Sequence, residues 1–273
     1  MRLLLIRHGD PDYEHDGLTP VGEREAALLV PRMAGETVTE FFVSTMGRAR
    51  ATARPTLEAL GRTAEECDWL REFSIPVRRP DRNGEYSSVP WDWLPADWLQ
   101  DPRLLDPVRW RENEVLAAEH IGEEYDRVVE AFDALLQAHG YRRSGLCYAA
   151  ERPNTETLAF FCHFGLSCVL LSHLMNCSPM VLWQGLCMAP SSVTTVYTEE
   201  RRPGIAAFRT AAVGDISHLY ARQVPPSFAA RFCECYGDGT RIEAFPKASI
   251  SAMELAPARL ITRSAAAMQV AIS

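Results

Sequence analysis

Three short apolar runs in this 273-residue chain end in polar or charged residues, and this repetition constrains the fold more than any other feature. Short apolar runs bounded by charge are typical of buried strands. In an open α/β sheet, ligands bind outside the carboxyl ends of the strands. The pattern therefore predicts that two arginines and two histidines meet at one edge of a sheet. The runs and the residues that follow them are 2–6 before Arg7 and His8, 41–43 before Ser44 to Arg48, and 157–162 before His163.

The segments after the first two runs predict helices, so the expected fold class is α/β. Thr19 is suited to cap a helix and Pro20 to occupy its first position, and apolar residues continue at helical spacing to Met33. A second helix is expected over residues 48–60, closed by Gly61. A strand–helix–strand–helix beginning favours a mostly parallel sheet with helices on both faces.

An irregular insertion at about 76–120 interrupts this pattern and contains Trp91, Trp93 and Trp98. Because tryptophans need apolar surface to bury against, we expect an ordered lid over one end of the sheet. We expect residues 1–245 to form a single domain that includes this lid, and residues 246–273, rich in Ala and Ser, to form a weakly structured tail. The other expected elements are helices at 121–139, 166–176 and 227–236 and strands at 193–198 and 205–211.

Charge and cysteine content argue against several classes of function. The formal net charge is −8, which disfavours nonspecific nucleic-acid binding, although a local Arg and His cluster can still bind a small anion. The first apolar run is too short for a signal peptide, and no stretch approaches the length of a membrane span. The eight cysteines are scattered, and the close pair Cys233 and Cys235 has the spacing of neither a redox pair nor a zinc site. We expect a cytoplasmic protein without nucleic-acid or membrane partners.

Five sequence blocks resemble, in order, the motifs of the histidine phosphatase superfamily, which contains cofactor-dependent phosphoglycerate mutase and many small phosphatases. Together they extend over roughly residues 1–200. Five ordered blocks are much more specific than an Arg-His-Gly tripeptide alone. The resemblance implies a phosphoglycerate mutase-like fold and phosphoryl-transfer chemistry. The blocks are residues 4–9, 18–22, 44–53, 70–72 and 162–165.

Within this resemblance, His8 stands in the position of the nucleophile that takes up the phosphoryl group. A neutral imidazole is a good nucleophile near pH 7, and the resemblance implies a phosphohistidine intermediate that is transferred to water. Arg7 and Arg48 are expected to bind the phosphate oxygens as planar, permanently charged forks. His163, expected to be protonated, adds a donor at the start of a helix.

Glu72 matches the block that carries the general acid, which protonates the leaving oxygen. Glu85 is the alternative, because the glycine and tryptophan that usually follow this block in the family are missing here. Ser192 follows the segment where the family places a loop near the phosphate, and it is a candidate for a phosphate contact. The remaining histidines show no ligand spacing with carboxylates, so we expect neither a metal nor a cofactor.

Phosphatase and mutase both fit the resemblance, and the sequence favours the phosphatase. Mutases typically carry a Glu-Arg-His-Tyr-Gly-like run at the acid, whereas residues 73–76 of this chain read Phe-Ser-Ile-Pro after Glu72. We therefore expect a phosphomonoesterase that hydrolyses a small phosphorylated metabolite. The alternatives are mutase-type phosphoryl transfer and a noncatalytic phospho-ligand binding protein, which is disfavoured because both arginines and both histidines are present. The sequence indicates neither the substrate nor the oligomeric state.

Overall fold

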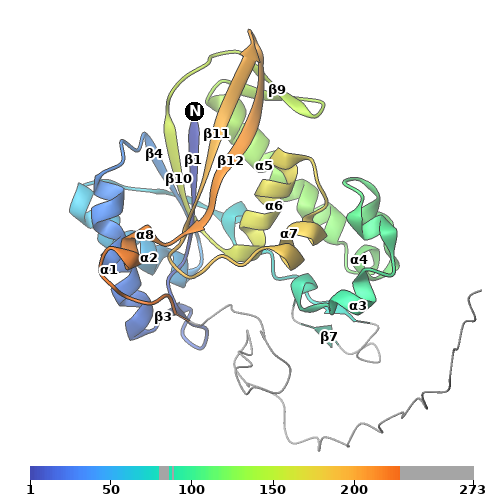
Figure 1. The fold of residues 1–273 in the computed structure, drawn as a ribbon, viewed down its shortest axis with the longest axis horizontal. Coiled ribbons are helices and arrows are strands. Elements are labelled where there is room, and N and C mark those ends of the chain that lie inside the picture. The colour runs from blue at the N-terminus through green and yellow to red at the C-terminus, as the bar shows by residue number, and fades with distance from the viewer. Residues whose placement is uncertain (80–85, 88, 228–273) are drawn as a thin grey trace, which may run out of the picture.

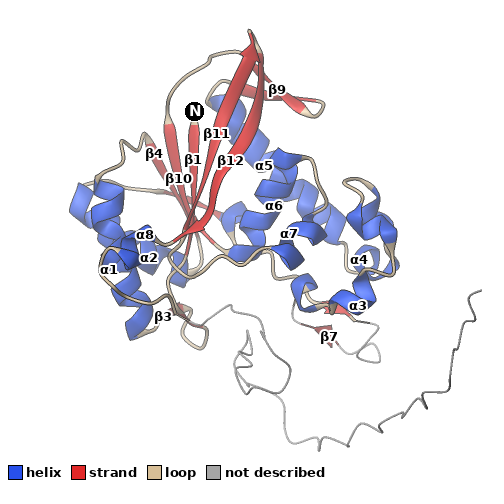
Figure 2. Ribbon diagram, viewed as in Figure 1, coloured by secondary structure: helices blue, strands red, loops and turns tan. Residues whose placement is uncertain are grey.

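Within the part of the chain that the structure describes, residues 1–79, 86–87 and 89–227, an eight-stranded mixed sheet forms the centre of this computed structural model (Figures 1 and 2). The strand order is β5-β4-β10-β1-β11-β12-β9-β8. The first four strands are parallel, as predicted, whereas the pairings from β1 onward are antiparallel. The strands are β1 (Arg2–Arg7), β4 (Glu40–Ser44), β5 (Glu65–Cys67), β8 (Tyr141–Ser144), β9 (Cys147–Ala150), β10 (Thr157–Cys162), β11 (Val193–Arg202) and β12 (Ile205–Asp215).

Helices cover both faces of the sheet, as the sequence predicted. In Figure 1, α1, α2 and α8 lie on one side, and α5, α6 and α7 lie on the other. The alternation of side chains along a strand explains this arrangement. In β1, Leu4 and Ile6 join the apolar cluster under α1 and α2, while Leu3 and Leu5 join the larger cluster on the opposite face. The helices are α1 (Pro20–Ala34), α2 (Gly47–Leu60), α5 (Ile121–Ala138), α6 (Phe164–Met175), α7 (Pro179–Gly185) and α8 (Ser217–Tyr220).

Local sequence signals set the ends of the first two helices where they were predicted. The Thr19 hydroxyl accepts a hydrogen bond from the Gly22 amide, and Pro20 is the first residue of α1. Helix α2 ends at Gly61, which has a left-handed φ of 60°. Glycine adopts this conformation without the steric penalty that a Cβ would bring. The beginning of α1 and the end of α2 are therefore readable from neighbouring residues.

The Trp-rich insertion is built from short helices and packs on the side of α5, α6 and α7 (Figure 1). Trp91, Trp93, Trp98 and Trp110 are buried in the larger apolar cluster. The short elements of the insertion are β6 (Val77–Arg78), β7 (Tyr86–Ser87), η3 (Pro90–Asp92), α3 (Pro95–Trp98), η4 (Pro102–Leu105), η5 (Arg109–Glu112) and α4 (Glu114–Ala118).

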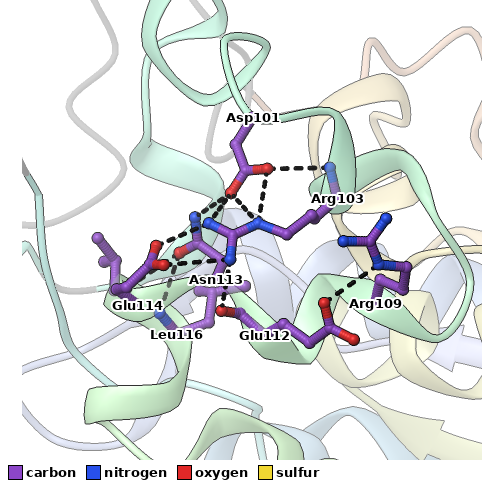
Figure 3. A network of polar contacts seen from close by, with 8 residues as sticks. Asp101, Arg103, Arg109, Glu112, Asn113, Glu114 and Leu116 are labelled. Atoms are coloured by element: carbon purple, nitrogen blue, oxygen red, sulfur yellow. Dashed lines mark hydrogen bonds and ion pairs between the residues drawn. The ribbon is translucent and has the colours of Figure 1, made fainter.

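A polar network centred on Arg103 fastens this insertion together (Figure 3). Arg103 forms ion pairs with Asp101, at 2.8 Å, and with Glu114, at 2.7 Å. Asn113 donates a second hydrogen bond to Asp101. These bonds to Arg103 and Asn113 lower the pKa of Asp101 to about 2. The network therefore joins η4 to α4 within the described part of the insertion.

Some observed elements were not predicted, and two predicted elements cannot be compared with the structure. The hairpin of β8 and β9 was not predicted, because Arg142 and Arg143 interrupt its apolar pattern. Helix α7 was not predicted either. The helix expected at 227–236 and the tail expected at 246–273 lie outside the described residues, apart from Ser227. Among the described residues, no helix is long and apolar enough to cross a membrane.

Candidate active site

The predicted convergence of strand ends takes place at the carboxyl edge of the parallel half of the sheet. Strands β4, β10 and β1 are neighbours, and the amide of His8 donates to the carbonyl of Cys162 at 3.0 Å. The ring centroids of His8 and His163 lie 5.2 Å apart. Arg7 and Arg48 are buried beside them. Parallel pairing therefore brings together all four residues that the sequence placed at strand ends.

His8 is a neutral imidazole, and in the described part of the chain Nδ1 is the ring nitrogen that has a hydrogen-bond partner. Burial, followed by the charges of Arg7 and Arg48, lowers the pKa of His8 well below its ordinary value. Its Nδ1 lies 2.7 Å from the carbonyl oxygen of Gly9. Because a carbonyl only accepts, Nδ1 carries the proton, which leaves the lone pair on Nε2. This is the state that a nucleophilic histidine requires.

The two arginines are held by contacts that leave donor groups free. Arg7 donates from Nη1 to the carbonyl of Met188, and its guanidinium lies 5.8 Å from the ring centroid of Phe164. Arg48 donates from Nη1 to Asp16 at 2.7 Å. Among the described residues, neither Nε atom has a hydrogen-bond partner. Buried guanidinium N–H groups of this kind are well suited to phosphate oxygens.

Asp16 and Tyr13 both contact Arg48, and neither residue was predicted from the sequence. The second carboxylate oxygen of Asp16 accepts from the Gly47 amide at 2.6 Å, at the start of α2. The Arg48 guanidinium lies 5.4 Å from the ring centroid of Tyr13. Both residues lie in the loop between the Arg-His-Gly block and Thr19, so their position next to a recognised block was the available signal.

His163 differs from the protonated state that the sequence analysis expected. Burial, together with the neighbouring His8 and Arg48, lowers the pKa of His163 well below its ordinary value. Its Nε2 lies 2.8 Å from the hydroxyl of Ser44, the last residue of β4. In the protein by itself, His163 is therefore neutral. Its Nδ1 has no hydrogen-bond partner among the described residues.

Glu72 lies at the amino end of α6 with the properties of an acid. Its Oε1 accepts hydrogen bonds from the amides of Leu166, at 3.0 Å, and Phe73, at 2.9 Å. Burial raises the pKa of Glu72, against the opposing effects of Arg48 and the Leu166 amide. A proton is therefore retained to higher pH than on an exposed glutamate, and Oε2 is the oxygen left to carry it. Glu85, the alternative acid, lies outside the described residues.

A match to a protein-family model establishes the family of the chain. The model of the histidine phosphatase superfamily (branch 1) matches residues 3–210. The chain belongs to this superfamily. A curated relative, named a probable phosphoglycerate mutase from Yersinia enterocolitica, is 29% identical over 86 residues. That match covers 28% of this chain and 40% of the relative, so it spans less than half of the relative's length.

Solved structures share the fold of this histidine phosphatase superfamily member. A phosphoserine phosphatase variant from Entamoeba histolytica, in complex with phosphoserine, has a TM-score of 0.52 and 16% identity over 80% of this chain and 98% of its own. A mycobacterial glucosyl-3-phosphoglycerate phosphatase has a TM-score of 0.51 and 18% identity over 78% and 98%. Bacillus stearothermophilus YhfR has a TM-score of 0.52 and 20% identity over 80% and 98%. At these identities the likeness establishes the phosphoglycerate mutase-like fold.

Ser192 is buried next to Arg7, but its backbone already forms hydrogen bonds. Its amide donates to the carbonyl of Ala189 at 3.1 Å, and its carbonyl accepts from the amide of Arg7 at 3.0 Å. A phosphate contact from Ser192 therefore stays a prediction, with the hydroxyl as the remaining group. Among the residues described, no group of three or more His, Cys, Asp or Glu side chains is placed to hold a metal ion.

Replacing Gly165 with alanine tests how tightly the insertion packs on the acid. A Cβ at Gly165 would lie 2.2 Å from the Trp91 ring and 2.8 Å from Oε1 of Glu72. We expect Gly165→Ala to lower the free energy of unfolding by about 1–3 kcal/mol, because overpacking forces neighbours to move. Chemical denaturation measures this loss. The control is Gly185→Ala, where a Cβ meets nothing within 4 Å; equal stability of the two variants would contradict the packing.

Proposed function

We propose that the protein is a phosphomonoesterase that hydrolyses a small phosphorylated metabolite through a phosphohistidine on His8. The observation that carries this proposal is the neutral His8 imidazole, with Nδ1 bonded to Gly9 and the lone pair on Nε2, beside two buried arginines. A cationic site with an uncharged nucleophile suits a phosphate dianion, because the nucleophile adds no repulsion to the substrate's charge.

In the first half of the proposed reaction, Nε2 of His8 attacks phosphorus and the bond to the leaving oxygen breaks. Arg7 and Arg48 bind the nonbridging oxygens throughout the in-line transfer. Glu72 gives its proton to the leaving oxygen, in keeping with its raised pKa. In the second half, Glu72 as carboxylate takes a proton from water, which attacks the phosphohistidine and releases phosphate. His163 is proposed as a further contact to phosphate through Nδ1, once the substrate's negative charge favours its protonation.

Hydrolysis, rather than mutase-type transfer, is favoured by the chain around the acid. Glu72 is followed by Phe73 and, two residues further, by Ile75, which packs against the larger apolar cluster. Residues 73–76 carry no cationic side chain that could bind a second anionic group of a bisphosphorylated intermediate. The relatives named as phosphatases act on phosphoserine and glucosyl-3-phosphoglycerate, so these compounds are the first substrates to test.

A panel of phosphorylated metabolites screened for phosphate release tests the proposal directly. The panel contains phosphoserine, 3-phosphoglycerate, glucosyl-3-phosphoglycerate, sugar phosphates and a generic aryl phosphate. Isomerisation of 3-phosphoglycerate is followed in parallel. Phosphate release without isomerisation supports the phosphatase, whereas isomerisation faster than release would assign the mutase activity. Binding of these compounds without turnover would leave the noncatalytic alternative.

Chelators are expected to leave the activity unchanged. The proposed steps place all positive charge on Arg7, Arg48 and His163, so no metal ion is needed to neutralise the phosphate. The measurement is phosphate release before and after dialysis against EDTA. Activity that is lost on dialysis and restored by a divalent ion would contradict the mechanism.

A further inference from the structure

Residues 216–227, the last described segment of the chain, pack against helix α1. We call this segment the C-terminal arm. It begins after β12, includes α8, and lies beyond the residues 3–210 that the family model matches. In Figure 1, α8 lies beside α1, and the two helices are in contact. The arm is therefore an addition to the matched region that packs against α1.

One contact joins the arm to the backbone of the nucleophile through a single serine. Nε2 of His218 lies 2.9 Å from the hydroxyl of Ser191. The amide of Ser191 donates to the carbonyl oxygen of His8 at 3.0 Å. Both His218 and Ser191 are buried, with 5% and less than 1% of their surface exposed. Two hydrogen bonds in series thus connect His218 to the residue that carries the reacting nitrogen.

Ser191 has a backbone conformation that needs such support. Its φ of 59° lies in the left-handed region, where a residue with a Cβ is strained and persists only if its surroundings hold it. The His218 side chain holds it by bonding its hydroxyl. Burial, followed by the charge of Arg32, lowers the pKa of His218 to about 4, while Asp215 opposes this shift. The imidazole is therefore neutral near pH 7, and the bond to Ser191 persists there.

A second contact connects the other end of the arm, through Glu25, to Asp10, which follows His8 in the chain. The buried carboxylate of Glu25 accepts from the Ser227 amide at 3.1 Å and from the Asp10 amide at 2.8 Å. Asp10 is two residues beyond His8. At the start of the arm, Arg32 pairs with Asp215 at 2.7 Å and donates to the Ser217 hydroxyl at 3.2 Å. The arm is thus attached at both ends, with His218 between them.

We propose that the C-terminal arm positions the nucleophile, with His218 acting through Ser191 as the positioning residue for His8. His218 does not contact the reacting atoms. It maintains the hydrogen bond from the Ser191 amide to the His8 carbonyl oxygen. This bond in turn keeps Nε2 of His8 in line with the phosphorus. In-line transfer is sensitive to misplacement of about 1 Å, so loss of this support lowers turnover more than substrate binding. The inference rests on the proposed role of His8 as nucleophile.

The test is a double-mutant cycle between His218 and Ser191. His218→Phe keeps the ring volume and removes the hydrogen bond, and we expect kcat to fall about tenfold while KM changes less than about twofold. In a Ser191→Ala background, His218→Phe should have no further effect on kcat, because the bond is already lost. His218→Gln, whose amide can donate to Ser191, should recover most of the lost turnover.

His139→Phe serves as the matched control. His139 is a partly buried histidine whose side chain is bonded to Glu156, at the end of the sheet opposite the site. Its replacement is expected to leave kcat unchanged whatever happens to stability. Wild-type kcat in His218→Phe, or a loss that adds fully to that of Ser191→Ala, would overturn the inference. His8→Ala reports separately on the nucleophile, so the two failures are distinguishable.

Discussion

Replacing His8 with alanine is expected to abolish phosphatase activity and leave the fold intact. His8 follows the last residue of β1, and among the described residues its side chain makes one hydrogen bond, to the carbonyl of the adjacent Gly9. Its removal takes away the nucleophile and its ring contact with His163, but it breaks no side-chain hydrogen bond between elements in the described part of the chain. We expect phosphate release from a generic aryl phosphate to fall below about a hundredth of the wild-type rate. Circular dichroism and thermal unfolding establish that the variant is folded.

The phosphoenzyme gives a second measurement of the same prediction. A phosphoimidazole bond survives alkali, so wild-type protein quenched in alkali after mixing with labelled substrate should retain the label. His8→Ala should retain none. His15→Ala is the control, because His15 is an exposed histidine in the following loop that pairs with Asp12, and it should behave as wild type. A folded His8→Ala variant with more than about a hundredth of wild-type activity would exclude His8 as the nucleophile.

Glu72→Gln is expected to slow substrates according to their leaving group. The amide oxygen of glutamine can still accept from the Leu166 and Phe73 amides, so the local structure is kept while the transferable proton is lost. An alkyl phosphate, whose alkoxide leaves poorly, should be slowed by roughly a hundredfold or more. An activated aryl phosphate should be slowed much less, because its phenolate needs little protonation.

The pH dependence of Glu72→Gln provides an independent readout. A general acid must be protonated, and burial raises the pKa of Glu72 above its ordinary value. Wild-type turnover of the alkyl phosphate should therefore persist to higher pH than an exposed glutamate allows and then fall as pH rises through this raised pKa. The variant should lack that fall. Glu85→Gln should affect both substrates mildly and alike; leaving-group dependence in that variant alone would transfer the role of acid to Glu85.

Much of the fold was predictable because its signals are local. Thr19, Pro20 and Gly61 set helix ends through bonds and conformations that involve only their immediate neighbours. The buried strands β1, β4 and β10 were recognisable as apolar runs bounded by polar residues. The antiparallel half was predicted less completely, since short strands with charged residues, such as β8, carry little periodic signal.

In the candidate site too, residues with local sequence signals were predicted and residues defined by long-range contacts were not. Arg7, His8, Arg48 and His163 were identified from sequence, because each lies at or shortly after a strand end and within a family-like block. Asp16 and His218 were not, because their roles arise from contacts with residues 32 and 27 positions away. The sequence left two candidate acids, and the position of Glu72 at the α6 amides depends on a contact 94 residues apart.

The sequence by itself determined which chemical groups this protein brings together near the ends of its parallel strands: an imidazole, two guanidinium groups and a second histidine. These groups can be identified locally, because strand ends and motif blocks are formed by consecutive residues. Only the tertiary structure decided the protonation of those groups. His8 and His163 are neutral and Glu72 retains a proton at higher pH because burial penalises their charged forms. Burial is a property of the packed chain, and no run of residues specifies it alone.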